Sequence, residues 1–251
     1  DLIPMYFELD GNFPNHEANP IEAKNLKDLQ NRVKKEKADI GLAFDGDADR
    51  CFLIDELGGL VNPSALTALI AVRELKANPG ASIIYNLISS KTVPEVIAEN
   101  GGIGIRSRVG HSYIKSTMAQ TGAVFGGEHS GHFYFNDFWR ADSGMLAALY
   151  ALAELMASNL SLSELLKPYK RYVSSGEINT KVKDVTKSIS RVRDKYHGEY
   201  QVDELDGLTI TASTWWFNLR PSNTEPLLRL NVEADTEKEM IKIRNAVLAL
   251  I

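Results

Sequence analysis

The stretch AFDGDADRCFLIDE, residues 43–56, places three aspartates at alternate positions directly after an apolar run. Asp45, Asp47 and Asp49 are separated only by a glycine and an alanine, small residues that let the backbone turn sharply. Carboxylates this close repel one another unless a cation lies among them. Oxygen ligands on a tight loop suit a hard divalent cation, Mg²⁺ before Ca²⁺, and disfavour zinc. We therefore predict a Mg²⁺ site at the end of a buried strand, where α/β proteins place their sites.

Three other interpretations of this loop remain beside the Mg²⁺ site. The first is a solvated acidic turn that binds no ligand. An EF-hand matches at the aspartates and at Glu56, but its sixth position needs glycine and holds Arg50, and strands rather than helices flank the loop. An aspartyl-phosphate phosphatase would use Asp45 as its nucleophile. That class normally has Thr or Val in place of Asp49, and no later paired-Asp motif completes its metal site.

Outward from the loop, apolar periodicity predicts a chain of alternating helices and strands. Helices are predicted over residues 21–38, 63–77, 92–102, 111–122, 143–158, 161–169, 183–196 and 236–251. Strands are predicted over residues 1–11, 39–44, 51–56, 81–90, 102–110, 123–135 (broken by a Gly-rich loop), 176–182, 208–213, 213–219 and 227–234. The pattern indicates three units: an incomplete α/β unit (1–58), a complete α/β unit (59–170) and a smaller α+β unit with an antiparallel sheet (171–251).

Composition narrows the class of protein. The net charge of −5 argues against nucleic acid as the main partner, and no apolar run approaches the roughly 20 residues of a membrane span. The single cysteine, Cys51, excludes an internal disulfide framework and fits a reducing cytoplasm. The chain starts at Asp1 inside a predicted strand, so we expect a piece of a longer protein. The sequence gives no prediction of the oligomeric state.

A second polar turn, GGEHSGH at residues 126–132, combines a carboxylate, a hydroxyl and two imidazoles with three glycines. Glu128 and Ser130 stand two apart, so on an extended loop both face one side. Glu128 can accept hydrogen bonds from two vicinal hydroxyls, and Ser130 can donate or accept one. A zinc site made of Glu128, His129 and His132 is the alternative, but no further ligand motif accompanies it.

A third polar turn, RPSNTEP at residues 220–226, is suited to a phosphate. Arg220 offers a planar fork, and Ser222 and Thr224 offer hydroxyls. Asn223 lies between them, and asparagine tolerates a positive φ if the turn requires one. A plain turn between two strands is the structural alternative.

Taken together, FDGDADR, GGEHSGH and RPSNTEP resemble, in order and spacing, three loops of the α-D-phosphohexomutases, the phosphomannomutase/phosphoglucomutase family. FPNHEANP and VGHSYIK are similar to family stretches as well. The resemblance implies mixed-sheet α/β units of the phosphohexomutase type and a smaller α+β C-terminal domain. Residues 1–58 would be part of domain 2 with the metal loop, 59–170 domain 3 with the sugar loop, and 171–251 domain 4 with the phosphate loop.

The resemblance also implies a reaction, in which phosphate moves between C1 and C6 of mannose or glucose phosphate through a phosphoserine and a hexose 1,6-bisphosphate. The family's serine loop has no match here, since TASTWW (211–216) lacks its His-Asn-Pro. We therefore expect these residues alone to be inactive. The implied roles are transition-state neutralisation for Arg50, general acid/base work for His132, and substrate contact for His111 and Lys91. A non-catalytic sugar-phosphate-binding module stays open as a different function.

Overall fold

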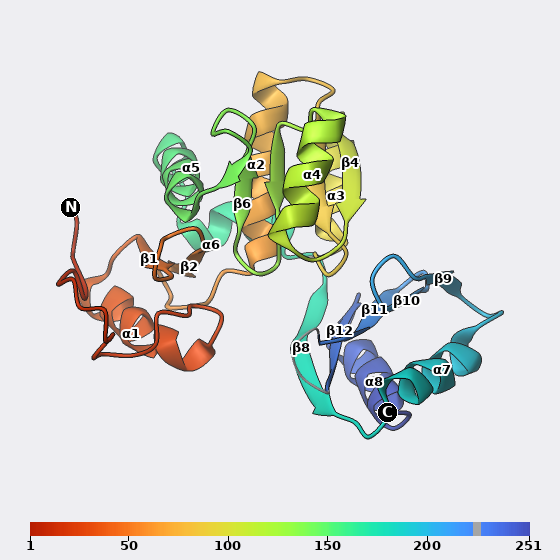
Figure 1. The fold of residues 1–251 in the computed structure, drawn as a ribbon. Helices are drawn as coiled ribbons and strands as arrows, with labels where there is room; N and C mark the ends of the chain where they lie inside the picture. The colour runs from red at the N-terminus through yellow and green to blue at the C-terminus, as the bar shows by residue number, and fades with distance from the viewer. Residues whose placement is uncertain (223–226) are drawn as a thin grey trace.

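Three separate sheets organise the chain, and each is built from one continuous part of the sequence (Figure 1). The structure is a computed structural model, and it describes residues 1–222 and 227–251. The first sheet has two strands, and the second and third have five strands each.

The first sheet is an antiparallel pair whose connecting loop carries the aspartates. Its elements are η1 (Ala23–Leu26), α1 (Lys27–Glu36), β1 (Ile40–Phe44) and β2 (Cys51–Asp55). Helix α1 covers the pair because its buried Val33 packs with Leu26 and Ile54. All five residues of β2 are buried, so the loop before it is anchored at its C-terminal end. Strands on both sides of the loop contradict an EF-hand, which needs helices there.

The strand predicted over residues 1–11 is wrong. These residues form turns and irregular backbone, with Leu2, Phe7 and Leu9 exposed. A strand is stable only when a neighbour accepts and donates its backbone hydrogen bonds. None of the strands described here pairs with this segment, so its alternating pattern has no sheet to join.

The middle unit contains a mixed sheet in the order β4-β3-β5-β6-β7, with β4, β3 and β5 parallel and the other pairs antiparallel. Its strands are β3 (Ser82–Asn86), β4 (Ile103–Ser107), β5 (Phe125–Gly127), β6 (Phe133–Phe135) and β7 (Ala141–Asp142). Its helices are α2 (Pro63–Ala77), α3 (Thr92–Glu99), α4 (His111–Thr121), α5 (Gly144–Ala157), α6 (Leu162–Leu165) and the short η2 (Lys167–Tyr169).

Helices cover both faces of this sheet, and the alternation of side chains along β3 explains why. Ile83 packs into the core shared with α2, α3 and α5. Its neighbour Ile84 points to the opposite face and packs against Ile114 and Met118 of α4. Helix α2 begins where Asn62 caps it by accepting from the Ser64 N–H at 2.9 Å, with proline at its first position.

The C-terminal unit is an antiparallel sheet in the order β8-β12-β11-β10-β9 with two helices on one face. Its elements are β8 (Val173–Lys181), α7 (Val185–Tyr196), β9 (Gln201–Asp203), β10 (Leu208–Thr211), β11 (Trp215–Pro221), β12 (Leu227–Ala234) and α8 (Glu237–Leu248). Figure 1 shows α7 and α8 on the side of the sheet away from the middle unit.

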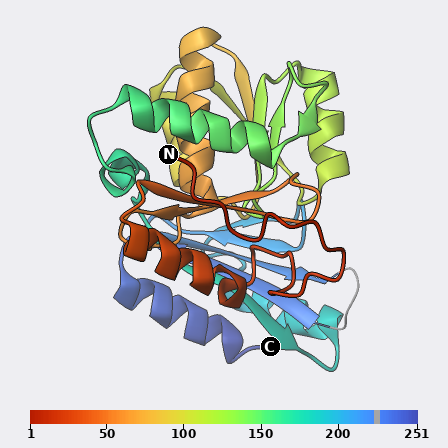
Figure 2. The same ribbon diagram turned by 90° about the vertical axis from the view of Figure 1, so that its left-hand side faces the viewer.

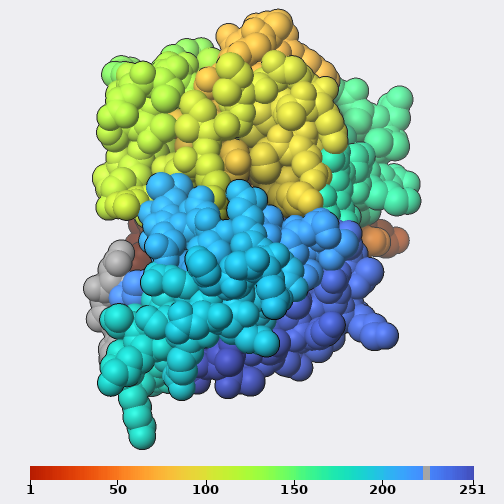
Figure 3. Space-filling view, turned by 90° about the vertical axis from the view of Figure 1, so that its right-hand side faces the viewer, coloured from red at the N-terminus to blue at the C-terminus, as the bar shows by residue number. Residues whose placement is uncertain are grey.

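Alternation along β11 gives this sheet one apolar and one polar face. Phe217 and Leu219 pack against α7 and α8. Trp216, Asn218 and Arg220 point the other way and are nonetheless buried, because the middle unit covers them. Figure 3 shows the C-terminal unit, in cyan and blue, pressed against the yellow-green surface of the middle unit. The fold thereby turns a buried polar surface of the C-terminal unit toward the loops of the middle unit.

The predicted fold class, α/β units with a mixed sheet followed by a smaller antiparallel α+β unit, is confirmed. The helix over residues 63–77 begins and ends as predicted. The sequence missed the short strands β7 and β9. The unit boundaries at residues 58 and 170 stay a prediction. Within the described ranges, no helix combines the length and apolar character that crossing a membrane requires.

Candidate functional site

The loop between β1 and β2 is closed by its own ion pair. The Arg50 backbone N–H donates to Asp45 Oδ1 at 3.1 Å, and Arg50 Nε donates to Asp45 Oδ2 at 2.6 Å. Arg50 Nη1 also donates to Asn19 Oδ1 at 3.2 Å, which connects the loop to the preceding segment. Burial acts to raise the pKa of Asp45, but the hydrogen bonds from Arg50 outweigh it and hold that pKa below its usual value. Asp45 is therefore fixed and ionised.

The three aspartates converge as predicted. One carboxylate oxygen from each of Asp45, Asp47 and Asp49 lies within 4.8 Å of the others. Asp49 Oδ1 is buried and has no hydrogen-bond partner among the described residues. Burial, with Asp45 beside it, raises the pKa of Asp49, against the opposing charge of His132. A converging set of oxygens with one buried and unpartnered is what a hard divalent cation requires, so these residues fit Mg²⁺.

Backbone pairing brings the sugar loop to the aspartate loop, although the two are about 80 residues apart. Arg50 and His132 form an antiparallel bridge, and the Cys51 N–H donates to Gly131 O at 3.0 Å. Gly131 has φ +88°, and a Cβ there would lie 2.5 Å from the Phe52 ring, so glycine is needed for this approach.

His132 lies beside the aspartates as a result. His132 Nε2 is 3.5 Å from Asp49 Oδ1, and its Nδ1 is 2.9 Å from Ser130 Oγ. When Nδ1–H donates to the Ser130 hydroxyl, Nε2 is the nitrogen that can take up or release a proton beside the carboxylates. Of the predicted site residues, the structure thus brings together the three aspartates, Arg50, Ser130 and His132.

Two further residues belong to this cluster: Asp142, which the sequence placed near the sugar loop without a physical argument, and Lys115, to which it assigned no role. Asp142 Oδ2 lies 4.0 Å from His132 Nε2, and Lys115 Nζ lies 2.8 Å from Asp142 Oδ1. Asp49, His132 and Asp142 form a second group whose ligand atoms lie within 4.8 Å of one another. A signal existed for Lys115, which stands four residues after His111 and so lies on the same helical face. Asp142 carries no local pattern, because only the short strand β7 places it here.

Glu128 is buried and already holds three protein donors. Tyr134 Oη donates to Oε1 at 2.6 Å, and Oε2 accepts from Asn86 Nδ2 at 3.2 Å and from the Gly110 N–H at 3.1 Å. A carboxylate has about four acceptor positions, so roughly one remains for a ligand. The predicted contact of Glu128 with sugar hydroxyls stays a prediction.

His111 and Lys91 are placed differently from each other. His111 begins α4 and directly follows Gly110, so its backbone lies next to the Glu128 carboxylate. Lys91 makes its contacts elsewhere: its N–H donates to Glu233 at 2.9 Å, and its Nζ lies 3.9 Å from Glu95 Oε1 and 5.5 Å from the centre of the Tyr172 ring. The structure records no contact between Lys91 and the aspartate cluster.

Arg220 projects from β11 toward the middle unit and is held by Glu177. Its Nη2 donates to Glu177 Oε2 at 2.8 Å, while Arg229 Nη1 donates to Glu177 Oε1 at 3.2 Å. Arg220 Nε is buried without a partner in the part of the chain that the structure describes. The Ser222 N–H donates to Leu227 O at 2.9 Å. The predicted phosphate ligands Asn223 and Thr224 lie outside the described residues.

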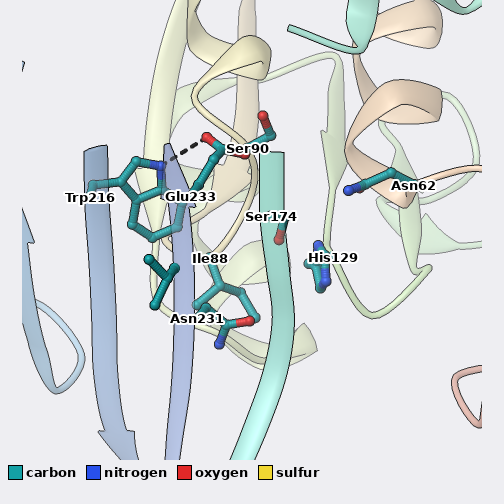
Figure 4. Close-up of a pocket in the computed structure, with 9 residues that line it drawn as sticks. Asn62, Ile88, Ser90, His129, Ser174, Trp216, Asn231 and Glu233 are labelled. Carbon is teal, nitrogen blue, oxygen red and sulfur yellow. Dashed lines mark hydrogen bonds between the residues drawn. The ribbon is translucent and has the colours of Figure 1, made fainter. Parts of the chain in front are cut away.

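His129 connects the sugar loop to the C-terminal unit. It lines a pocket between the two units, opposite Ser174 and Asn231 and near the Trp216–Glu233 hydrogen bond (Figure 4). Burial lowers its pKa, and the charges of Glu177 and Arg220 act on it in opposite directions. Within the described ranges, neither group of residues that could hold a metal includes Glu128 or His129, which argues against the zinc site considered above.

Family models match three successive parts of the chain. Phosphoglucomutase/phosphomannomutase alpha/beta/alpha domain II matches residues 1–58, alpha/beta/alpha domain III residues 62–172, and the C-terminal domain residues 177–250.

Individual relatives agree with these matches. A phosphomannomutase of Methanocaldococcus jannaschii is 47% identical over 231 residues, covering 92% of this chain and 51% of the relative. A phosphomannomutase of Escherichia coli K12 is 40% identical over 250 residues, covering 99% and 55%. A solved phosphoglucomutase/phosphomannomutase family protein of Burkholderia thailandensis superposes with a TM-score of 0.90 at 32% identity, covering 100% of this chain and 54% of that chain. The chain spans about half the length of the curated relatives it matches.

Proposed function

The chain belongs to the phosphoglucomutase/phosphomannomutase family, and we propose that it forms the metal-, sugar- and phosphate-binding part of a cytoplasmic phosphohexomutase. The reaction is the reversible transfer of phosphate between C1 and C6 of mannose or glucose phosphate, through a hexose 1,6-bisphosphate. The serine that carries phosphate between the two positions lies outside these 251 residues. The chain alone therefore binds its ligands without turnover.

One observation carries the proposal: His132 Nε2 lies 3.5 Å from Asp49, because main-chain bonds join the two loops. A candidate proton-transfer group and a candidate divalent-cation site thus share one location. Phosphoryl transfer needs positioning and charge neutralisation more than covalent chemistry by the protein, and this location offers both.

Asp45, Asp47 and Asp49 are the residues that would hold Mg²⁺, which when bound neutralises charge on the transferring phosphoryl group. Arg50 sits at the same loop with its Nε on Asp45, so its guanidinium adds positive charge beside that group. Its remaining N–H groups point toward the transferring oxygens in this proposal.

His132 is the proposed general acid/base. Its Nε2 lies next to Asp49 and Asp142, and in this proposal Nδ1–H donates to the Ser130 hydroxyl, which fixes the ring. The neutral imidazole can therefore take a proton at Nε2 from an attacking sugar hydroxyl, and the imidazolium that results can give it to a departing sugar oxygen. Lys115 Nζ lies 2.8 Å from Asp142 Oδ1 and so holds that carboxylate in place beside the ring.

Recognition of the ligand is divided between two loops. Glu128 and Ser130, with His111 nearby, contact hydroxyls at C3 and C4 of the sugar. Arg220, with Ser222, Asn223 and Thr224, grips the phosphate that is not transferred. Because Glu128 and Ser130 would contact hydroxyls common to glucose and mannose, which differ at C2, both sugars fit this site.

The aspartyl-phosphate alternative is less well supported, because that class normally has Thr or Val at the position of Asp49, which here joins the converging carboxylates. A non-catalytic binding module remains the competing function, and turnover in the intact gene product distinguishes it.

Calorimetry with three sugar phosphates tests the proposal. With Mg²⁺ present, glucose 1-phosphate and mannose 1-phosphate should bind with affinities within about threefold of each other. Galactose 1-phosphate, which is inverted at C4, should bind at least about tenfold more weakly, since one hydrogen bond of about 1.4 kcal/mol is lost. Equal binding of all three, or no binding of any, rejects the proposed sugar site. Robust mutase turnover by the 251 residues alone would contradict the proposal that the phosphate-carrying serine lies outside them.

A further inference from the structure

The turn between β9 and β10, residues 203–207, contacts the middle unit next to the sugar loop. Arg108 Nε donates to Leu205 O at 2.8 Å, and the Val109 N–H donates to Asp206 Oδ2 at 3.2 Å. Arg106 Nη1 adds an ion pair with Asp203 at 2.7 Å. Three contacts therefore fix this turn against the end of β4 and the segment that follows it.

The same turn rests directly on the backbone of Arg220. Gly207 has φ +71°, and a Cβ there would lie 2.6 Å from Leu219 O and 2.7 Å from Arg220 Cα. Asn218, which is fully buried, donates from Nδ2 to Asp206 O at 3.0 Å. The turn therefore packs closely against β11 next to Arg220, with glycine required at position 207, and a shift of the turn would strain or break the Asn218 hydrogen bond.

On the middle unit, the contact continues to the sugar loop. The Val109 N–H is held by Asp206, and the next N–H, that of Gly110, donates to Glu128 Oε2 at 3.1 Å. Two successive N–H groups of one short segment thus bond one carboxylate from each unit. His111, the following residue, begins α4 and is positioned by the same segment.

We propose that the turn 203–207 couples the phosphate-binding and sugar-binding loops, with Asp206 as a positioning residue. This inference rests on the proposed function and deepens it. The Asp206 carboxylate fixes the 109–110 segment so that the Gly110 N–H stays directed at Glu128. Glu128 is then set for a sugar only while the C-terminal unit, with Arg220, is in place.

The coupling has a measurable consequence. A ligand that carries both phosphate and sugar bridges the two loops and depends on Asp206, whereas inorganic phosphate has no sugar to contact Glu128. Coupling free energies between two sites typically change affinity about 5- to 150-fold, and a single hydrogen bond belongs at the lower end. Loss of Asp206 should therefore weaken glucose 1-phosphate and spare inorganic phosphate.

The test compares both ligands by calorimetry, with Mg²⁺ present, on the whole 251-residue chain. Asp206→Ala should lower the affinity for glucose 1-phosphate about five- to tenfold and that for inorganic phosphate less than about twofold. Asp206→Asn, whose amide oxygen can still accept from Val109, should restore glucose 1-phosphate affinity to within about threefold of the wild type. Asp194→Ala removes an equal charge at an exposed position of α7 and should change neither affinity.

Hydrogen exchange gives a readout without ligand. The amide of Val109 should exchange faster in Asp206→Ala than in the wild type, while the amides of β6 should be unchanged. If Asp206→Ala weakens both ligands equally, or neither, or leaves the Val109 amide protected, the coupling is rejected. If the wild type binds inorganic phosphate but not glucose 1-phosphate, the proposed function fails, and the coupling fails with it.

Discussion

Replacing Gly144 with alanine should displace the aspartate loop from a distance. Gly144 is the first residue of α5, and its N–H donates to Ala48 O at 3.0 Å. A Cβ at this position would lie 2.5 Å from the Arg50 carbonyl carbon and 2.9 Å from Ala48 O. The start of the helix therefore presses directly on the backbone that carries Asp49.

The size of the effect follows from these distances. Carbon atoms in ordinary contact lie about 3.5 Å apart or more, so the added methyl is about 1 Å too close to rigid backbone. Such overpacking costs about 1–3 kcal/mol. Alanine favours a helix over glycine by up to about 1 kcal/mol, so the net loss of stability should be about 1–2 kcal/mol. Displacing the backbone around Asp49 should also weaken Mg²⁺ binding about tenfold, as changes around a metal site commonly do.

Urea unfolding with and without Mg²⁺ measures both effects. Gly11→Ala is the matched control, because nothing lies within 4 Å of the Cβ it would add. The control should unfold within about 0.5 kcal/mol of the wild type and keep its full stabilisation by Mg²⁺. A Gly144→Ala protein that matches the control in both measurements would refute the claim that α5 positions the aspartate loop.

Three further predictions concern single side chains. Burial raises the pKa of Glu233, against hydrogen bonds from Trp216 and Lys91, so the folded protein keeps this proton to a higher pH than the unfolded chain. The free energy of unfolding should therefore fall as pH rises from about 4.3 through the folded pKa of Glu233. In Glu233→Gln the urea midpoint should change less with pH over that range. An unchanged pH dependence in the variant would contradict this prediction. Asp49→Asn should remove most of the roughly 2.7 kcal/mol that Mg²⁺ supplies at 100 times its dissociation constant, measured by thermal unfolding; full stabilisation would exclude Asp49 as a ligand. Lys91→Met should change calorimetric glucose 1-phosphate affinity less than about twofold, since Lys91 contacts Glu95 and Tyr172, whereas a tenfold loss would establish the substrate contact expected from the sequence.

The sequence predicted those features that local chemistry determines. The aspartate loop is contiguous in sequence. Its small spacer residues and its flanking apolar strands are all local, so they predict the convergence of the aspartates without any distant contact. Helix α2 was predicted to the residue because a proline marks its start and apolar residues run through it.

What the sequence missed depends on pairing between distant segments. Asp142 joins His132 only because β6 and β7 pair, and a two-residue strand leaves no periodicity to recognise. The turn 203–207 carries no motif, and its position depends on packing of one unit against another. For residues 1–11 the sequence predicted a strand that the structure does not contain. An alternating pattern forms a strand only where a neighbouring strand is available to pair with it.

The aspartate loop and the C-terminal unit are joined to the sugar loop by different kinds of contact. The aspartate and sugar loops are joined by main-chain hydrogen bonds around Cys51, which is 1% exposed, so opening them would leave buried polar groups unpaired. The C-terminal unit is joined near the sugar loop by contacts such as Arg106–Asp203, whose side chains are 28% and 37% exposed. Exposed pairs of this kind contribute about 0.2–1 kcal/mol each and are screened by salt. The residues proposed to hold the metal and to act as general acid/base thus form one rigid platform, and the C-terminal unit, with the proposed phosphate site, is the part whose placement a bridging ligand would stabilise.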